Sequence, residues 1–169
     1  MNDDAVRNHG ISTDPSYGRI ASSGRPMNIL QVEDTRSDVV LTAHALKSAG
    51  IPYTLQVVGS GSEAISFLQR KEGFEGVPRP DLILLDLSLP GVNGHDVLKF
   101  VKGDSELKTI PVVVFTTMAA EESQVMAYEN SANSYVLKPL DLEKFTSVVQ
   151  SIAAYWCHTS SLVPVRTDR

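Results

Sequence analysis

The sequence DLILLDLSLPG, at residues 81–91, contains four consecutive apolar residues followed directly by an aspartate. A short run that is apolar at every position, rather than at alternate positions, is typical of a strand in a parallel sheet covered on both faces. We therefore predict a strand over residues 81–85. Asp86 follows this strand, so its carboxylate is expected at the strand's carboxyl end.

On either side of this stretch, short apolar runs alternate with longer amphipathic segments, a pattern typical of βα units. The other predicted strands cover residues 28–32, 53–58, 112–115 and 134–137. The predicted helices cover residues 37–49, 61–70, 94–102, 120–130 and 142–156. The sequence thus predicts five βα repeats and an α/β fold.

Local signals mark the ends of several predicted helices. Ser60 and Glu63 can form a capping box at the start of the second helix, in which each side chain binds the other's free backbone N–H. Gly50 and Gly103 stand where the first and third helices are expected to end. Residues 71–80 contain two Gly and two Pro, which predicts a connecting loop.

The length of 169 residues indicates one domain, without room for a separate output domain of usual size. We expect this domain at residues 27–157, between a flexible N-terminal tail at 1–26, rich in Ser, Gly, Asn and Asp, and a C-terminal tail at 158–169.

Charge and cysteine content narrow the function classes. A formal net charge of -5 and a pI of about 5.3 argue against nucleic-acid binding, which needs a basic face. The single cysteine, Cys157, excludes an internal disulfide. Neither a signal peptide nor an apolar stretch long enough to span a membrane is visible, so we expect a cytoplasmic protein with no membrane partner.

Carboxylates follow two of the predicted strands. Glu33 and Asp34 come after residues 28–32, and Asp86 comes after residues 81–85. If the first and third strands are neighbours, these groups converge at the sheet edge where ligands bind. Each pair of like charges a few ångströms apart would cost roughly 4 kcal/mol, so the cluster requires a cation or a raised pKa. Oxygen ligands with room for water favour Mg²⁺ (or Mn²⁺). The alternative is a set of solvated loop residues, with Asp34 capping the first helix.

A hydroxyl and an ammonium are predicted at the same edge. Thr116 follows the fourth strand and Lys138 follows the fifth. Each alone is more often a turn residue or a surface residue. The Thr116 hydroxyl and the Lys138 ammonium can both donate hydrogen bonds to the oxygens of a phosphoryl group. With a carboxylate nucleophile and a divalent cation beside them, they form a set of groups suited to phosphoryl transfer.

These residues resemble the receiver domains of two-component response regulators over about residues 27–152. The resemblance is carried by residues 30–34 (LQVED), 81–91 (DLILLDLSLPG), 111–117 (PVVVFTT) and 135–139 (YVLKP), which occur in the family's order and spacing. It implies the doubly wound, CheY-like (βα)₅ fold, also called flavodoxin-like, with strand order 2-1-3-4-5. It also implies a signalling switch rather than an enzyme, one that catalyses only its own phosphorylation and dephosphorylation.

The resemblance implies a role for each site residue. Asp86 would accept a phosphoryl group from a kinase phosphohistidine. Asp34 and Asp86 would bind Mg²⁺ directly, Glu33 through water, and Ser88 through its backbone carbonyl. Lys138, with a cis bond to Pro139, would bind a phosphoryl oxygen; Thr116 would move to that group, and Tyr135 would swing inward behind it. Two positions depart from the commonest pattern, since Glu33 replaces Asp and Ser88 replaces Asn.

A narrower resemblance is to the small regulators that serve cyanobacterial and bacterial phytochromes. It rests on residues 73–89, 115–117, 119–122 and 138–142, running on to 151–152 and Trp156. It implies that the partner is a light-sensing histidine kinase of the bacterial phytochrome type.

Two other readings remain open. Residues 59–64 (GSGSEA) fit a dinucleotide-binding loop between a strand and a helix, with Asp81 and Asp86 as ribose contacts. That reading leaves Asp34, Thr116 and Lys138 without a role. The other is a degenerate receiver that acts only as an interaction module, which would require loss of the acceptor or the metal ligands, and all of these are present.

The last predicted helix has an apolar series at Leu142, Phe145, Val149, Ile152 and Trp156, which can pack one face on the sheet. A second apolar set comprises Ala127, Tyr128, Tyr135, Val148 and Tyr155. An extra apolar patch often marks a protein interface, although these residues could merely cover the core edge. We predict a homodimer through the fourth helix, fifth strand and fifth helix, as related receivers form.

Overall fold

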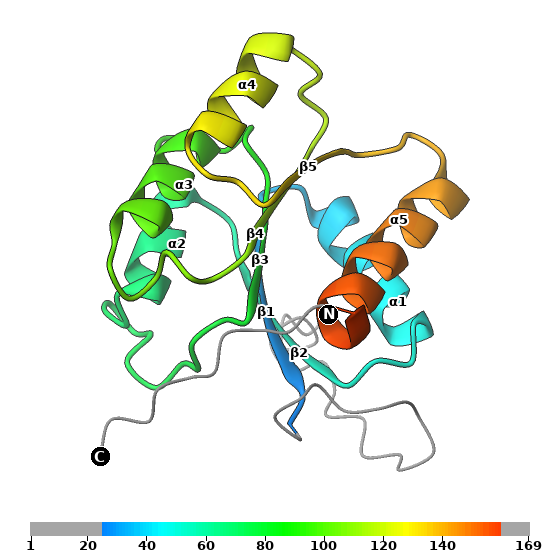
Figure 1. Cartoon of the computed structure of the whole chain (residues 1–169). Coiled ribbons are helices and arrows are strands. Elements are labelled where there is room, and N and C mark those ends of the chain that lie inside the picture. Colours follow the sequence, from blue (N-terminus) through cyan, green and yellow to red (C-terminus); the bar gives the residue numbers. More distant parts are fainter. Residues whose placement is uncertain (1–24, 160–169) are drawn as a thin grey trace.

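The computed structural model describes residues 25–159, and within them the chain forms a five-stranded parallel sheet with helices on both faces (Figure 1). The strands are β1 Met27–Val32, β2 Tyr53–Val58, β3 Leu82–Leu85, β4 Val112–Thr116 and β5 Ser134–Leu137. The helices are α1 Arg36–Ser48, α2 Gly61–Leu68, α3 Gly94–Gly103, α4 Glu121–Glu129 and α5 Leu142–Ala154, followed by the π-helix Tyr155–Thr159. The strand order β2-β1-β3-β4-β5 confirms the predicted doubly wound fold.

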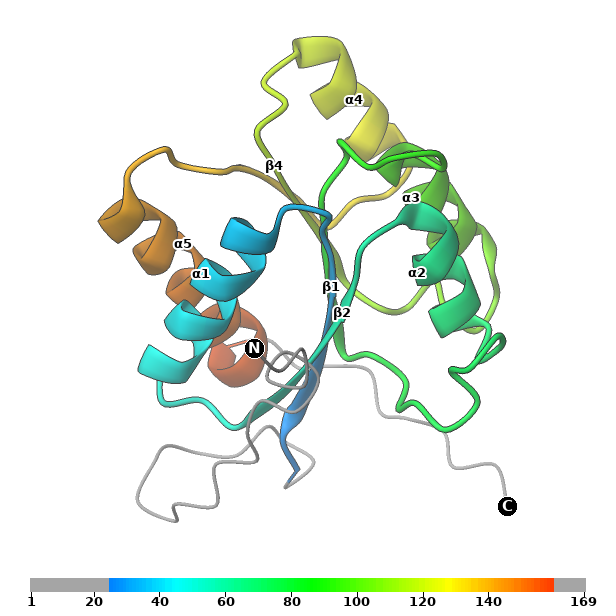
Figure 2. The ribbon, with the colours of Figure 1, turned by 180° about the vertical axis from the view of Figure 1, so that it is seen from behind.

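Two layers of helices sandwich the sheet. Helices α1 and α5 cover one face, and α2, α3 and α4 cover the other, as Figures 1 and 2 show from opposite sides. Successive side chains of a strand point to opposite faces. In β3, Ile83 and Leu85 pack on the α2–α3 side, whereas Leu82 and Leu84 pack on the α1–α5 side. All four residues are buried, which explains why this strand is apolar at every position.

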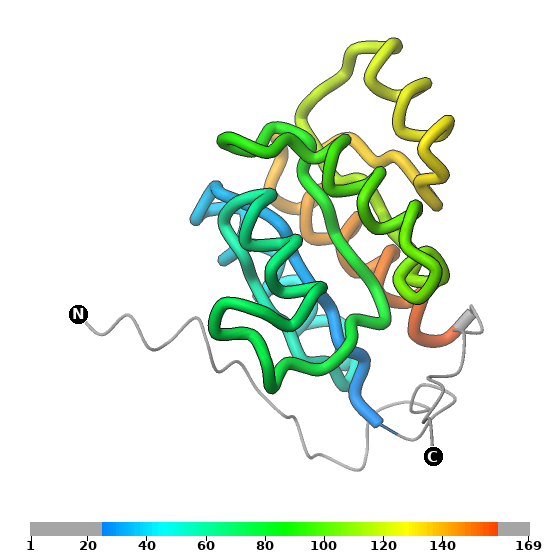
Figure 3. Tube along the Cα trace, turned by 90° about the vertical axis from the view of Figure 1, so that its left-hand side faces the viewer, coloured from blue at the N-terminus to red at the C-terminus, as the bar shows by residue number. Residues whose placement is uncertain are grey.

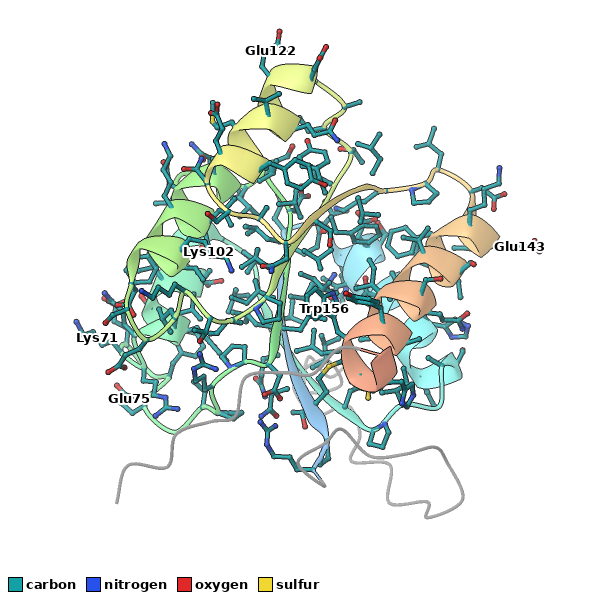
Figure 4. The ribbon with its side chains drawn as sticks, viewed as in Figure 1. Lys71, Glu75, Lys102, Glu122, Glu143 and Trp156 are labelled. Carbon is teal, nitrogen blue, oxygen red and sulfur yellow. The ribbon has the colours of Figure 1, made fainter. Side chains whose placement is uncertain are left out.

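Helix α4 contributes little to the core. Figure 3 shows it at one end of the molecule, and Glu122 stands at its outer end in Figure 4. Only Ser123 and Ala127 of this helix are buried. The prediction that Ala127 belongs to a surface patch was wrong, because it packs into the cluster on the α2–α3 side. Tyr128, from the same predicted patch, is exposed.

Helix α5 packs through a narrower stripe than predicted. Phe145, Val149 and Ala153 are its buried residues, spaced four apart. Leu142 was predicted in this stripe but is 58% exposed, because it is the first residue of the helix and precedes the part that lies on the sheet. Trp156, labelled in Figure 4, is half-buried against the same cluster as Phe145.

The predicted helix ends are confirmed in part. Ser60 caps α2 by accepting a hydrogen bond from the Glu63 N–H (3.2 Å), but the Glu63 carboxylate accepts from the Gly59 N–H (2.7 Å) rather than from Ser60. Gly50 ends α1 with a φ of 65°, which favours glycine. Gly103 is the last residue of α3 but has no left-handed φ, because the Asp104 carboxylate starts a new turn there by accepting two backbone N–H groups.

An ion pair fixes the start of the described chain to the amino end of β3. The two terminal nitrogens of the Arg25 guanidinium, Nη1 and Nη2, donate to Asp81 at 2.7 and 2.6 Å, and the Asn28 N–H donates to the same carboxylate. Asp81 is buried. The predicted tails at 1–26 and 158–169 lie almost wholly outside the described residues. Within residues 25–159, no helix is both long and apolar enough to cross a membrane.

Candidate functional site

The carboxyl ends of four strands bring the predicted polar residues together. Glu33 and Asp34 follow β1, and Asp86 follows β3, which pairs directly with β1. One carboxylate oxygen from each of these three residues lies within 4.8 Å of the others. Thr116 ends β4, and Lys138 follows β5. The structure therefore gathers these five predicted side chains at one edge of the sheet.

Lys138 lies at the centre of the carboxylates. Its ammonium donates to Glu33 (2.5 Å), Asp38 (2.8 Å) and Asp86 (2.9 Å). The side chains of Lys138, Glu33 and Asp86 are only 3%, 2% and 5% exposed. A buried charge is costly unless it is paired, and here one cation serves as the partner of several anions.

The two oxygens of Asp86 have different partners. Oδ2 accepts from Lys138, whereas Oδ1 accepts from the Thr116 hydroxyl (2.7 Å) and from the Ser88 backbone N–H (3.1 Å). The Ser88 side chain is exposed. Asp86 is thus held in one orientation by three donors from three segments of the chain.

The environment shifts the pKa values of these groups in different directions. Burial alone would raise the pKa of Asp86, but the hydrogen bonds from Lys138, Thr116 and Ser88 outweigh it and lower that pKa below its ordinary value. Burial raises the pKa of Glu33, and its bond with Lys138 only partly offsets this. Burial opposes the charge of Lys138, but hydrogen bonds to Asp38, Glu33 and Asp86 raise its pKa. Asp86 is therefore an ionised carboxylate at neutral pH.

The donor set fits a hard divalent cation. Glu33, Asp34 and Asp86 offer only oxygen ligands, as Mg²⁺ and Mn²⁺ prefer. Asp34 is exposed and forms no bond with Lys138 among the described contacts, so its carboxylate is available to an ion and leaves room for water.

A chain of hydrogen bonds leads from Asp86 to helix α4. The Met118 N–H donates to the Thr116 hydroxyl oxygen (3.2 Å), and the Tyr135 hydroxyl donates to the Met118 carbonyl (2.7 Å). Ser123, in α4, bonds to the Met118 sulfur and to Nε2 of His95 in α3 (2.8 and 2.9 Å). The ring of Tyr135 is half-buried. The segment between β4 and α4 is therefore tied to both the acceptor and its neighbouring helices.

Sequence reasoning missed two contributors to this region. Asp38 lies in the first turn of α1, where an acidic residue is commonly explained by the helix dipole alone. Its contact with Lys138 joins residues 100 positions apart and has no local sequence signal. His95 was missed for the same reason, because its partner Ser123 belongs to another helix.

One expectation about the site was wrong. The described residues contain no cis peptide bond, so Lys138 and Pro139 are joined by a trans bond. The trans form of an X–Pro bond is intrinsically favoured by about 0.5–1 kcal/mol, and with it Lys138 already reaches all three carboxylates.

The dinucleotide reading of residues 59–64 finds no support in the geometry. A Cβ on Gly61 would lie 2.1 Å from the Val92 carbonyl oxygen, so this glycine allows close packing of two segments. The Gly59 N–H, which a phosphate would need, is bound by the Glu63 carboxylate.

Comparison with known proteins places the chain among response regulators. The family model of the response regulator receiver domain matches residues 29–150 of this chain. Response regulator Rcp1 of Synechocystis sp. is 40% identical over 140 residues, which cover 83% of this chain and 95% of that protein.

Two solved structures have the same fold. The phosphorylated cyanobacterial phytochrome response regulator RcpA is 35% identical, with a TM-score of 0.80, over 82% of this chain and 99% of that one. The Mn²⁺-bound form of Rcp1 is 40% identical, with a TM-score of 0.79, over 82% of this chain and 100% of that one. The chain therefore belongs to the response regulator receiver domain family and is related to the phytochrome response regulators.

Proposed function

We propose that this protein is a response regulator that accepts a phosphoryl group on Asp86 from the phosphohistidine of a histidine kinase, in a Mg²⁺-dependent reaction. The observation that carries the proposal is the position of Asp86, whose ionised carboxylate is oriented by Lys138 and Thr116 beside two further carboxylates. This arrangement offers a nucleophile, donors for phosphoryl oxygens and ligands for a cation.

In this proposal, Glu33, Asp34, Asp86 and the Ser88 carbonyl hold Mg²⁺ or Mn²⁺. The bound ion neutralises negative charge on the reacting oxygens. An Asp86 oxygen forms a bond to phosphorus while the bond between phosphorus and the histidine nitrogen breaks, and the electron pair of that bond returns to the imidazole. Lys138 exchanges its contact with Asp86 Oδ2 for one with a phosphoryl oxygen. We propose that the protein acts as a signalling switch, which catalyses only its own phosphorylation and dephosphorylation.

The switch in this proposal is the segment between β4 and α4. The Thr116 hydroxyl leaves Asp86 Oδ1 and donates to the phosphoryl group, and Tyr135 follows it inward. Because Met118 bonds to both residues, movement of Thr116 disturbs the hydrogen bonds that hold α4 in place. Phosphorylation of Asp86 thereby changes the surface that α4 and β5 present.

The partner we propose is a light-sensing histidine kinase of the bacterial phytochrome type, in the cytoplasm. This is supported by the relationship to Rcp1 and to RcpA, which is described as a cyanobacterial phytochrome response regulator. The formal net charge of -5 fits a protein partner better than nucleic acid.

The decisive experiment is incubation of the protein with Mg²⁺ and acetyl phosphate, followed by mass spectrometry. We expect the wild type to gain the mass of one phosphoryl group and Asp86→Asn to gain none. Omission of Mg²⁺ should abolish the gain in the wild type. A wild-type protein that gains no phosphoryl group would contradict the proposed function.

We further propose a homodimer through α4, β5 and α5. Its support is the exposure of Tyr128 (49%), Leu137 (48%) and Tyr155 (52%) on these elements and the π-helix that continues α5. Large exposed apolar side chains favour an interface. Light scattering should show a dimer that Tyr155→Asp weakens, and a strictly monomeric wild type, phosphorylated or not, would exclude it.

A further inference from the structure

We propose that Asp38 is a positioning residue that holds the Lys138 ammonium at the acceptor while Glu33 and Asp86 are engaged by the metal. This inference rests on the proposed phosphorylation of Asp86. It assigns a role to a side chain outside the cation-binding group of Glu33, Asp34 and Asp86.

Asp38 faces the site from helix α1. Its Oδ2 accepts from the Lys138 ammonium at 2.8 Å, and its Oδ1 is 3.4 Å from the Ser37 hydroxyl on the exposed side. The Asp38 side chain is 21% exposed, against 3% for Lys138. The buried residues Val39 and Thr42 anchor this part of the helix on the core, so the backbone that carries Asp38 has a fixed position beside Lys138.

Three carboxylates share the three protons of the Lys138 ammonium. Two of them, Glu33 and Asp86, belong to the group that fits a divalent cation. When their oxygens turn to the cation and the phosphoryl group, Asp38 is the carboxylate that keeps its contact with Lys138. A lysine side chain has much rotamer freedom, so one fixed partner limits where the ammonium can go.

Within residues 25–159, the ion pair that Asp38 forms is with Lys138. Its contribution therefore divides into two effects that substitutions can separate. The carboxylate accepts a hydrogen bond, which fixes the ammonium, and it carries a charge, which weakens the attraction of Lys138 for other anions. Asp38→Asn keeps an acceptor without the charge, whereas Asp38→Ala removes both.

The first experiment measures the rate of phosphorylation by acetyl phosphate with saturating Mg²⁺. We expect Asp38→Ala to be about ten-fold slower than wild type, the change that accompanies loss of one charge-assisted hydrogen bond, and Asp38→Asn to lie between the two. Asp96→Ala is the matched control, because Asp96 is also an acidic residue in the first turn of a helix. It should react at the wild-type rate.

The second experiment needs no phosphoryl donor. With Mg²⁺ bound, NMR should detect the Nζ protons of Lys138 as a slowly exchanging signal in the wild type, in Asp38→Asn and in Asp96→Ala. In Asp38→Ala the signal should broaden or disappear, while thermal unfolding shows that the variant is folded. A general loss of folding would change many signals and not the Lys138 Nζ signal alone.

The outcomes separate this inference from the function on which it rests. If the wild type gains no phosphoryl group, the proposed function fails. If the wild type reacts and Asp38→Ala reacts equally fast with an unchanged Nζ signal, the positioning role is wrong. Faster reaction of Asp38→Ala would also overturn it, because Asp38 would then act by weakening the charge of Lys138.

Discussion

At the scale of single residues, the site has more acidic than basic groups. Lys138 is bonded to three carboxylates, and Asp34 stands beside them without such a bond among the described contacts. Burial raises the pKa of Glu33, which shows how costly another negative charge is at this place. A divalent cation would relieve this excess of negative charge, so we expect metal binding and stability to be linked.

Asp34→Asn should separate these two effects. Asp34 is exposed and has only a 3.4 Å contact with the Thr35 hydroxyl, and its carboxylate adds a charge to the acidic cluster, so its substitution should not lower the melting temperature without metal. For the wild type, Mg²⁺ at 100 times its Kd should add about 2.7 kcal/mol to the free energy of unfolding. Asp34→Asn should lose most of this gain in thermal unfolding at the same Mg²⁺ concentration. Equal stabilisation of both proteins would show that Asp34 is not a ligand.

At the scale of elements, close packing between segments positions the acceptor. Helix α3 begins against the loop that carries Asp86: the Gly94 N–H donates to the Leu87 carbonyl at 3.1 Å. On the other side, α3 contacts α4 through the hydrogen bond between His95 and Ser123. Helix α3 therefore connects the acceptor loop with the helix that we propose to move.

Gly94→Ala should disturb this packing. A Cβ at Gly94 would lie 2.3 Å from the Asp86 carbonyl oxygen and 2.6 Å from the Leu87 Cα, and neither backbone atom can move freely. We expect a loss of about 1–3 kcal/mol in the free energy of unfolding, measured with urea, and slower phosphorylation of Asp86. Gly103→Ala in the same helix is the control, because apart from the adjoining backbone no described atom lies within 4 Å of its Cβ position. Similar losses for both variants would refute the steric explanation.

The contact between α3 and α4 should depend on pH. Burial and the nearby Lys99 lower the pKa of His95, although Asp96 opposes this, and the buried Nδ1 has no hydrogen-bond partner among the described residues. The unfolded chain therefore binds a proton more readily, with a pKa of about 6.5. The contribution of neutral His95 to stability is complete above this pH and is lost as the pH falls toward the lower pKa of the folded state.

His95→Gln should remove this part of the pH dependence. We expect urea unfolding at about pH 7.5 and pH 5.5, on either side of the ordinary histidine pKa, to show a smaller loss of stability for the variant than for the wild type. His44→Gln, an exposed position on α1, is the control and should keep the wild-type slope. A slope unchanged by His95→Gln would refute the prediction.

At the scale of the whole molecule, the sequence predicted what depends on neighbouring residues and missed what depends on distant ones. The apolar run of β3 and the positions of Asp86, Thr116 and Lys138 follow from strand pattern alone, because parallel strands end at a common edge. The exposure of Leu142 and the burial of Ala127 did not follow, because helical spacing does not tell where a helix leaves the core.

The amino edge of the sheet should depend on a distant pair as well. Arg25→Ala would remove the two hydrogen bonds from the guanidinium to the buried Asp81 carboxylate. Of the donors described above, the Asn28 N–H would remain. Because Arg25 is partly exposed, we expect a moderate loss of about 1–2 kcal/mol in urea unfolding. Arg36→Ala, an exposed position at the start of α1, should change stability little. If Arg25→Ala is equally neutral, the pair contributes nothing measurable.

The path of the chain has a practical consequence for protein engineering. Strand β1 begins at the edge of the sheet opposite Asp86, beside the Arg25–Asp81 pair, and α5 runs back from the carboxyl end of β5 toward that same edge (Figure 1). A fluorescent reporter joined ahead of Arg25 would start far from the acceptor and would not cover it. A protein fused at this end of the domain should therefore leave the phosphorylation site accessible.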